Sequence, residues 1–187
     1  MAFSEARWIQ KAKAGDSAAF GRLVTAYQDA ILYLIYDFIG NYEDARDLAQ
    51  DVFIKAFQRL HQFEGRSKFS TWLYRIAVNR ALDFKRRHHK EMIWDFDSPD
   101  SASRFLPDEA SFQSAGNSIE RKELRNQIEA CLSHVSENQK AAVILKYFHQ
   151  RTTEEIAEIM DCSPVTVRTH LFRAIQYMRK HLVIEDV

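Results

Sequence analysis

The chain has 187 residues, of which 46% are hydrophobic and 28% charged, and its 26 acidic side chains balance its 26 Lys and Arg side chains. This composition is typical of one or two soluble domains with hydrophobic cores, and it excludes a disordered chain. Only five Gly and three Pro interrupt the sequence, and runs of alternating β-branched residues are missing. The sequence therefore predicts an all-α fold.

The cysteine and hydropathy patterns indicate a protein of the reducing cytoplasm. Cys131 and Cys162 lie far apart and form no C-x-x-C pair, so neither a disulfide framework nor a common zinc motif is predicted. Residues 1–10 carry charge among their apolar side chains, and no apolar run approaches the roughly 18 residues that a membrane span needs. We expect no direct membrane insertion, no metal and no cofactor.

The balanced net charge conceals a segregation of charge along the chain. Residues 71–90 hold six Lys and Arg side chains against Asp83 alone, whereas residues 91–118 hold six acidic side chains against Arg104 alone. Residues 163–182 are basic again and contain no acid. Two basic segments separated by an acidic one favour a nucleic-acid partner more strongly than the net charge suggests.

The first predicted helix follows from apolar residues between Phe20 and Phe38, which recur at spacings of three and four. Asp16 or Ser17 can cap its start, because a short oxygen-bearing side chain accepts hydrogen bonds from first-turn amides. Gly40 follows its end, where a left-handed residue commonly terminates a helix. We expect one long, largely buried helix between these signals.

Two further helices are predicted before residue 90. The second starts after a cap near Asn41, and the polar residues 61–68 around Gly65 then interrupt the periodicity and form a loop. Ser70 or Thr71 caps the third helix, which runs into the basic segment. The expected buried stripe of the second helix comprises Leu48, Val52, Phe53, Ala56, Phe57 and Leu60.

Residues 91–118 lose helical periodicity and gather Ser, Asp and Pro, so we expect a flexible acidic linker much longer than ordinary connections. It divides the chain into a domain at 1–90 and a second domain at 119–187. Four short helices are predicted in the second domain. Their start signals are Ser136 with Gln139, Thr152 with Glu155, and Ser163 followed by Pro164.

The last two predicted helices, at 153–160 and 164–182, are joined by a tight turn at 161–163, which is the spacing of a helix-turn-helix. On the final helix, the apolar stripe Val167, Leu171, Ala174 and Met178 is expected to face the core. The opposite side presents Arg168, Thr169, Phe172, Arg173 and Gln176. These side chains suit base edges and phosphates in a major groove, although a solvated face on an ordinary helical hairpin is the alternative.

Three sequence motifs occur in order along the chain. They are DARDLAQDVFIKAF at 44–57, FSTWLYRIAVNRA at 69–81 and EIAEIMDCSPVTVRTHLFRA at 155–174. Together they resemble the extracytoplasmic-function (ECF, group 4) sigma factors of the sigma-70 family, and the resemblance spans about residues 15–182. It implies a sigma factor that binds core RNA polymerase and reads the −35 and −10 elements of promoter DNA.

The resemblance assigns the first motif to docking on the polymerase. It implies contacts from Asp47, Gln50, Asp51 and Phe53, although Phe53 could instead serve the core. This sequence has Arg46 where the family usually has a glutamate, which reverses one charge on that surface.

The resemblance places recognition and melting of the −10 element in the loop and the third helix. Aromatic stacking, amide contacts to a base edge and cationic contacts to phosphates are the chemistry expected there. Asn79 is the expected base contact, whereas for Trp72 a structural role is favoured over a base contact because it lies on the apolar stripe. The implied residues are Phe63, Glu64, Gly65, Arg66, Ser67, Lys68, Trp72, Arg75 and Asn79, with Arg80, Lys85, Arg86 and Arg87 on phosphates.

The resemblance places −35 recognition on the final helix. The implied residues are Thr166, Arg168, Thr169, Phe172, Arg173 and Gln176. His170 and Ile175 stand where the family commonly has arginine. The acidic linker resembles the family segment that threads the polymerase channels, with a solvated tether as the alternative. Family members are commonly held inactive by an anti-sigma factor, but no residue identifies such a partner.

Three other functions are alternatives for a sequence of this pattern. A different helix-turn-helix transcriptional regulator would need a receiver or ligand-sensing domain, and the first half shows no alternating strands. A helical adaptor is the second, and salt-dependent DNA binding would argue against it. The third is an enzyme, but the seven histidines form no H-E-x-x-H array and no nucleophile motif accompanies them. We therefore expect no catalytic residues.

Overall fold

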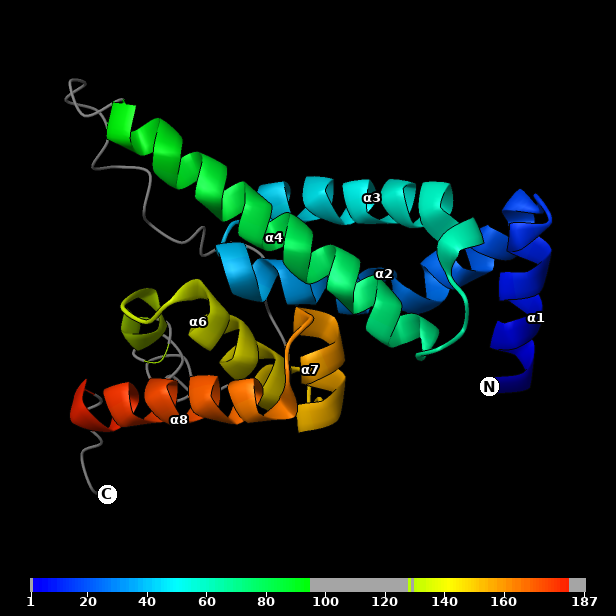
Figure 1. Cartoon of the computed structure of the whole chain (residues 1–187). Coiled ribbons are helices and arrows are strands. Elements are labelled where there is room, and N and C mark those ends of the chain that lie inside the picture. The colour runs from blue at the N-terminus through cyan, green and yellow to red at the C-terminus, as the bar shows by residue number, and fades with distance from the viewer. Residues whose placement is uncertain (1, 95–127, 129, 182–187) are drawn as a thin grey trace, which may run out of the picture. The chain divides into compact units, whose positions relative to one another are not determined.

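The computed structural model describes residues 2–94, 128 and 130–181, and the chain divides into two compact units, Met1–Pro107 and Asp108–Val187. Every regular element within the described residues is a helix (Figure 1), which confirms the all-α prediction. Of the linker predicted at 91–118, residues 91–94 continue a helix, and the rest lies outside the described residues. None of the helices in the described part is long and apolar enough to cross a membrane.

Within residues 2–94, the first unit contains four α-helices and a short 3₁₀ turn. The elements are α1 (Ala2–Lys13), α2 (Ser17–Ile39), α3 (Tyr42–Arg59), η1 (Leu60–Gln62) and α4 (Phe69–Trp94). Helices α2, α3 and α4 pack against one another, and α1 packs on α2 (Figure 1). Helix α1 does not follow from the sequence pattern, because Ile9 and Ala12 are the only buried side chains described on it and two such positions make no visible stripe.

The predicted start and end signals of α2 and α3 are confirmed. Asp16 accepts a hydrogen bond from the Ala19 amide at 3.0 Å, and Gly40 ends α2 with a φ of 78°. The Asn41 side chain accepts a hydrogen bond from the Asp44 amide at 3.0 Å. These caps satisfy amide groups that have no partner inside the helix.

The predicted cap of α4 is wrong, because the helix starts at Phe69, before both Ser70 and Thr71. The Trp72 amide already donates to the Lys68 carbonyl at 3.1 Å. Phe69 is only 3% exposed, so burial of its ring extends the helix toward the loop. The core of the first unit is built mainly from Leu23, Ile31, Leu34, Ile35, Phe38, Leu73 and Tyr74.

The second unit contains the predicted helix-turn-helix. Its elements are α6 (Glu137–Val143), a π-helical turn η3 (Ile144–Phe148), α7 (Thr153–Met160) and α8 (Pro164–His181). Of the helix predicted from residue 119, only residues 128 and 130–133 are described as helical. The sequence analysis did not foresee η3, which continues α6 through buried Ile144 and Leu145.

The predicted start signals of the second unit are confirmed by capping geometry. Both capping boxes form, at Ser136 with Gln139 and at Thr152 with Glu155. Helix α7 ends at Asp161 in the left-handed conformation, with a φ of 53°, and this residue starts the turn into α8. The core of the second unit comprises Leu132, Ile144, Leu145, Ile156, Ile159, Val167 and Ala174.

Candidate functional site

One side of α3 is exposed along most of the helix. Asp47 and Gln50 are exposed and Asp51 is half-buried, while Ile54 and Phe57 expose 55% and 46% of their surfaces. The spacing of three and four residues places these side chains on one face. The predicted polymerase contacts thus share a surface with two apolar residues that the sequence analysis did not assign to it.

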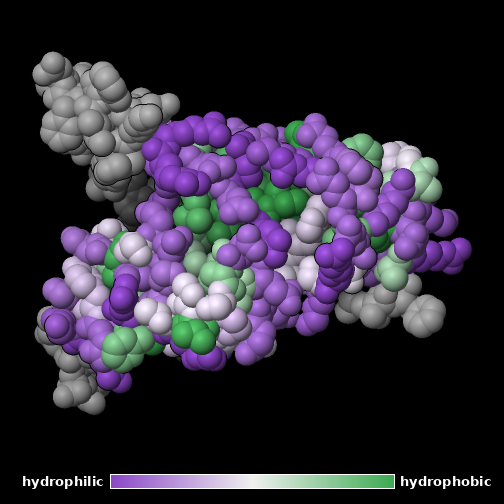
Figure 2. Space-filling model, in the orientation of Figure 1, coloured by the Kyte–Doolittle hydropathy of each residue, from purple (hydrophilic) through white to green (hydrophobic). Residues whose placement is uncertain are grey.

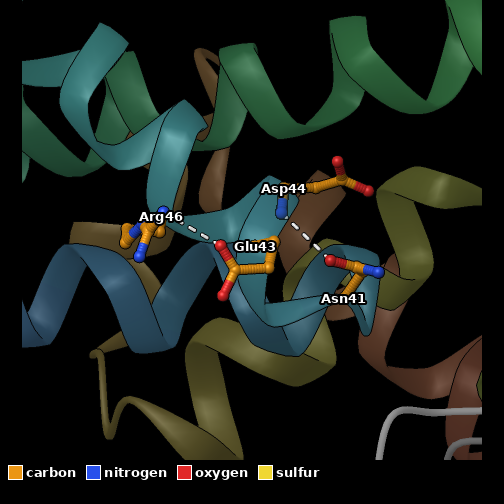
Figure 3. A network of polar contacts seen from close by, with 4 residues as sticks. All are labelled: Asn41, Glu43, Asp44 and Arg46. Carbon is orange, nitrogen blue, oxygen red and sulfur yellow. Dashed lines mark hydrogen bonds and ion pairs between the residues drawn. The ribbon is translucent and has the colours of Figure 1, made fainter.

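The amino-terminal end of this face carries charged side chains (Figure 3). Arg46 forms an ion pair with Glu43 at 2.9 Å, and the two side chains are 54% and 66% exposed. Exposed pairs of this kind contribute little to stability. Arg46, which reverses the charge usual at its position, is therefore accessible to a partner but partly neutralised by its neighbour.

An apolar groove of about 300 Å³ lies where α3 meets α2, lined by Phe20, Phe53, Ile54, Phe57 and Gln58. The rings of Phe20 and Phe57 meet edge to face at 4.9 Å between centroids. Phe53 is half-buried, so it contributes to the core and to the groove together.

The prediction that Phe57 is buried is wrong. It extends the apolar stripe of α3, but the stripe continues past the edge of α2 and leaves the ring at the surface. The exposure of Ile54 could have been predicted from the sequence, because it is an apolar residue outside the predicted buried stripe.

Hydrophilic residues cover most of the molecular surface seen in Figure 2, and hydrophobic residues emerge there in small separate areas.

The loop between η1 and α4 has a buried start and an exposed middle. The Phe63 ring is 7% exposed and packs at 5.5 Å from the Phe69 ring and 5.3 Å from the Trp72 ring. Gly65, with a φ of 76°, turns the chain outward. Phe63 and half-buried Trp72 therefore form the base of the loop in this structure.

The other predicted loop residues are accessible. Arg66 and Lys68 are exposed and Ser67 is half-buried. Arg66 forms an ion pair with Glu64 at 2.6 Å, with both side chains more than half exposed. The loop therefore offers cationic groups and backbone amides around a left-handed glycine.

Helix α4 carries the predicted polar face beyond the loop. Asn79, Arg86 and Arg87 are exposed, and Arg75 and Lys85 are half-buried. Arg86 forms an exposed ion pair with Asp83. This face combines one amide with several cations, and cationic side chains are the groups that follow the phosphates of a nucleic-acid strand.

Arg80 differs from the other predicted phosphate contacts. Its side chain is only 15% exposed, and its guanidinium forms an ion pair with Asp51 on α3. Its Nε is buried without a hydrogen-bond partner. The structure thus brings together two residues that the sequence analysis assigned to different sites.

The predicted outer face of α8 is exposed and its inner face is buried. Arg168, Thr169 and Arg173 are exposed, and Phe172 is 64% exposed. Gln176 and Thr166 are half-buried, and the Thr166 amide donates to Ser163 Oγ at 3.1 Å. Ser163 therefore caps α8, as predicted, by accepting from the Thr166 amide, while the four exposed side chains lie where a partner can reach them.

Two titratable groups next to this face remain uncharged near neutral pH. Burial, together with the charge of Arg173, lowers the pKa of His170 below its ordinary value. Burial and the charge of Asp161 raise the pKa of the Cys162 thiol. The positive charge of the α8 face therefore comes from its arginines.

Comparison with known families matches both units. Residues 23–91 match sigma-70 region 2, and residues 125–178 match sigma-70, region 4. The first match covers α3, the loop and most of α4, and the second covers the helix-turn-helix.

Characterised relatives extend the likeness over nearly the whole chain. The chain is 32% identical to the ECF RNA polymerase sigma factor SigW of Bacillus subtilis, covering 93% of this chain and 94% of that protein. It is 35% identical to the RNA polymerase sigma-H factor of Pseudomonas aeruginosa, covering 93% and 91%. It is 33% identical to the ECF RNA polymerase sigma-E factor of Escherichia coli K12, covering 89% and 87%.

Two solved structures share the fold. CnrH in complex with the cytosolic domain of CnrY aligns with a TM-score of 0.68 at 20% identity, covering 95% of this chain and 96% of that one. The sigma factor RpoE of Bartonella quintana, in complex with the anti-sigma factor NepR, aligns with a TM-score of 0.66 at 22% identity, covering 89% and 98%.

Proposed function

This chain belongs to the ECF RNA polymerase sigma factors of the sigma-70 family, and we propose how its two units divide promoter recognition. As a sigma factor, it binds core RNA polymerase and directs initiation at promoters. We assign polymerase docking and −10 recognition to residues 1–90, and −35 recognition to residues 119–187. The observation that carries this division is that each unit has a helix, α4 or α8, with one side buried in its core and cationic residues exposed on the other.

The −35 element is read by α8. Arg168 and Arg173 can donate paired hydrogen bonds to guanine edges, and the exposed Phe172 ring can contact a thymine methyl group. Ile156 and Val167, both completely buried, hold α7 and α8 in the helix-turn-helix. Thr166 and Gln176 are half-buried, so we assign them supporting contacts to the DNA backbone.

The −10 element is captured by the loop and α4. Gly65, Arg66, Ser67 and Lys68 form the rim of the pocket for an unstacked base, and Phe63 and Trp72 form its base. A flipped base is held by stacking and by hydrogen bonds to its edge. Asn79 is the amide that contacts a base edge on the α4 face.

The cations of α4 bind the phosphates of the same strand. We assign this contact to Arg75, Arg86 and Arg87, which are exposed or half-buried along the helix. Arg80 is assigned instead to the ion pair with Asp51, because a largely buried and already paired guanidinium adds little to phosphate binding.

Core polymerase docks on the exposed face of α3. Asp47, Gln50 and Asp51 supply its polar contacts, and the groove beside Phe53 supplies apolar area. Ile54 and Phe57 join the predicted set, because their exposed surfaces lie on the same face. Burial of these apolar side chains favours association, although the entropy lost on binding offsets a large part of that gain.

We propose an anti-sigma factor as a further partner. One of the two solved structures holds CnrH with the cytosolic domain of CnrY, and the other holds the sigma factor RpoE with the anti-sigma factor NepR. A regulator of this kind would act on a protein of the cytoplasm. We assign the chain no catalytic activity, because a sigma factor acts by binding.

A run-off transcription assay tests the proposal. The purified chain is added to bacterial core polymerase with fragments covering a bacterial genome, and we expect transcripts from a small set of promoters sharing −35 and −10 sequences. The chain alone should bind the same fragments weakly. If the mixture yields no transcript beyond that of core polymerase, the assignment as a promoter-specific factor is wrong.

Two variants separate the roles of the units. Asn79→Ala should impair opening of the −10 region, while Arg173→Ala should relax −35 preference, both with unchanged polymerase affinity. A third variant, Phe57→Ser, should weaken polymerase binding and leave DNA preference unchanged. Equal loss of polymerase affinity in the first two variants would contradict the division.

A further inference from the structure

Helix α1 precedes the part of the chain that matches sigma-70 region 2, which starts at residue 23. It packs along α2 and also contacts η1, the turn that leads into the −10 loop (Figure 1). The family match therefore gives α1 no role. The contacts that α1 makes within the first unit indicate a role for it.

The first link from α1 reaches the start of the loop. Lys13, the last residue of α1, donates a hydrogen bond from Nζ to the Phe63 carbonyl oxygen. The same Nζ lies 5.7 Å from the centroid of the Phe63 ring, within range of a cation–π interaction. One side chain thus holds both the backbone and the ring of the residue that begins the loop.

The second link reaches the end of the loop. The Tyr27 hydroxyl on α2 donates a hydrogen bond to Glu5 Oε2 on α1 at 3.0 Å. The Tyr27 ring lies 5.7 Å from the ring of Phe69, the first residue of α4. The two aromatic residues that flank the loop, Phe63 and Phe69, are therefore both connected to α1.

We propose that α1 braces the −10 loop and that Lys13 is the positioning residue that holds it ready for base capture. The proposal rests on the proposed function of the loop. Residues 64–68 are mostly exposed and include Gly65, so their conformation is set largely by how their two ends are fixed. A loop held in its binding conformation loses less entropy when a base enters it.

The brace is tested first in the chain by itself. The Phe63 amide donates to the Leu60 carbonyl at 3.1 Å, so its hydrogen exchange reports on the start of the loop. Lys13→Met keeps most of the alkyl chain and removes the charged donor. We expect its Phe63 amide to exchange about 10-fold faster, the order expected for loss of a charged hydrogen bond, with unchanged exchange at Ile35 in the core.

Two variants serve as controls for that measurement. Lys13→Arg keeps a cationic donor and should restore slow exchange at Phe63. Lys11→Met removes the same charge from an exposed position on the same helix and should leave exchange unchanged. If Lys13→Met and Lys11→Met give the same exchange rate as the parent chain, the brace does not exist.

The positioning role is tested in the holoenzyme on a promoter found in the genome-wide assay. We expect Lys13→Met to slow promoter opening about 10-fold, followed by permanganate reactivity of −10 thymines, with unchanged affinity for core polymerase. Lys13→Arg should recover opening.

Normal promoter opening despite faster exchange of the Phe63 amide would overturn the positioning role. A changed salt dependence of promoter binding without faster exchange would make Lys13 a phosphate contact instead. Failure of the parent chain to direct any transcript would overturn the proposed function, whereas the exchange result still decides the brace.

Discussion

The guanidinium of Arg80 on α4 is paired with the carboxylate of Asp51 on α3. The two partners differ in environment, because the Arg80 side chain is 15% exposed and the Asp51 side chain 48%. The carboxylate therefore lies toward the exposed face of α3, while the cation lies in the packing between two helices. The pair joins α3, to which we assign polymerase docking, to α4, to which we assign −10 recognition.

Removing the acid should destabilise the first unit more than removing the base. Asp51→Asn leaves a largely buried guanidinium unpaired, and we expect it to cost about 1–3 kcal/mol. Arg80→Met leaves a half-exposed carboxylate that water can solvate, so we expect a loss below about 1 kcal/mol. Urea unfolding followed by tryptophan fluorescence measures this, because Trp8, Trp72 and Trp94 all lie within the first unit.

Two controls define this result. The double variant should be more stable than the sum of the two single losses predicts, because the partners interact. Arg46→Gln disrupts the exposed pair with Glu43 and should change the unfolding free energy by less than about 0.5 kcal/mol. Equal losses for Asp51→Asn and Arg80→Met would show that the guanidinium is well solvated, contrary to its burial.

The salt dependence of promoter binding should distinguish Arg80 from Arg87. Each phosphate contact adds about 0.7 to 0.9 to the slope of log affinity against log salt concentration. We expect Arg87→Gln to reduce the slope of the holoenzyme by about that amount, because its side chain is exposed on α4. Arg80→Met should leave the slope unchanged, and a reduction as large as that of Arg87→Gln would return Arg80 to the phosphate contacts.

The buried side of each helix could be predicted from the sequence. Contacts between side chains of different helices were harder to predict. Periodicity orders a side chain relative to its own helix, so the outer face of α8 could be predicted, whereas the Arg80–Asp51 pair could not. Arg80 was read as part of a basic run, and its burial depends on the packing of α3. Local chemistry also predicted the caps at Asp16 and Asn41, because a cap involves only neighbouring residues.

The errors have related causes. Helix α1 could not be predicted because a short peripheral helix buries too few residues to show a period, although Lys13 contacts Phe63 at the start of the loop between η1 and α4. Phe57 was expected in the core because a stripe gives no information on where the neighbouring helix ends. The assignment of Phe63 to the pocket for a nucleobase stays a prediction, and its 7% exposure agrees with a place at the floor of that pocket.

Arg173→Ala should change which −35 sequences are preferred. Loss of a paired contact to a base edge costs about 1–3 kcal/mol of discrimination, measured by competition between promoter fragments with single −35 substitutions. Arg179→Ala is the matched control, because it removes an exposed charge near the end of the same helix. We expect that control to weaken all fragments equally. A preference that is unchanged in Arg173→Ala would exclude this side chain from base reading.

Acid should destabilise the second unit through His170. Its pKa is lowered from the ordinary value of 6.5 by burial and by the charge of Arg173, so the folded state takes up its proton at lower pH than the unfolded state. Stability is therefore fully present above about pH 6.5 and is lost as the pH falls through that value toward the folded pKa. Hydrogen exchange of the buried amides of Val143 and Leu145 reports on this unit.

The same measurement with His170→Gln isolates the contribution of the imidazole. Glutamine does not titrate, so amide exchange in this variant should accelerate less between pH 7 and pH 5 than in the parent chain, after correction for the intrinsic pH dependence of exchange. His181→Gln is the control, because that histidine is exposed near the end of α8 and should leave the parent profile unchanged. If His170→Gln and His181→Gln give the same acid profile, the acid sensitivity does not arise from the half-buried imidazole of His170, and protonation elsewhere in the unit must account for it.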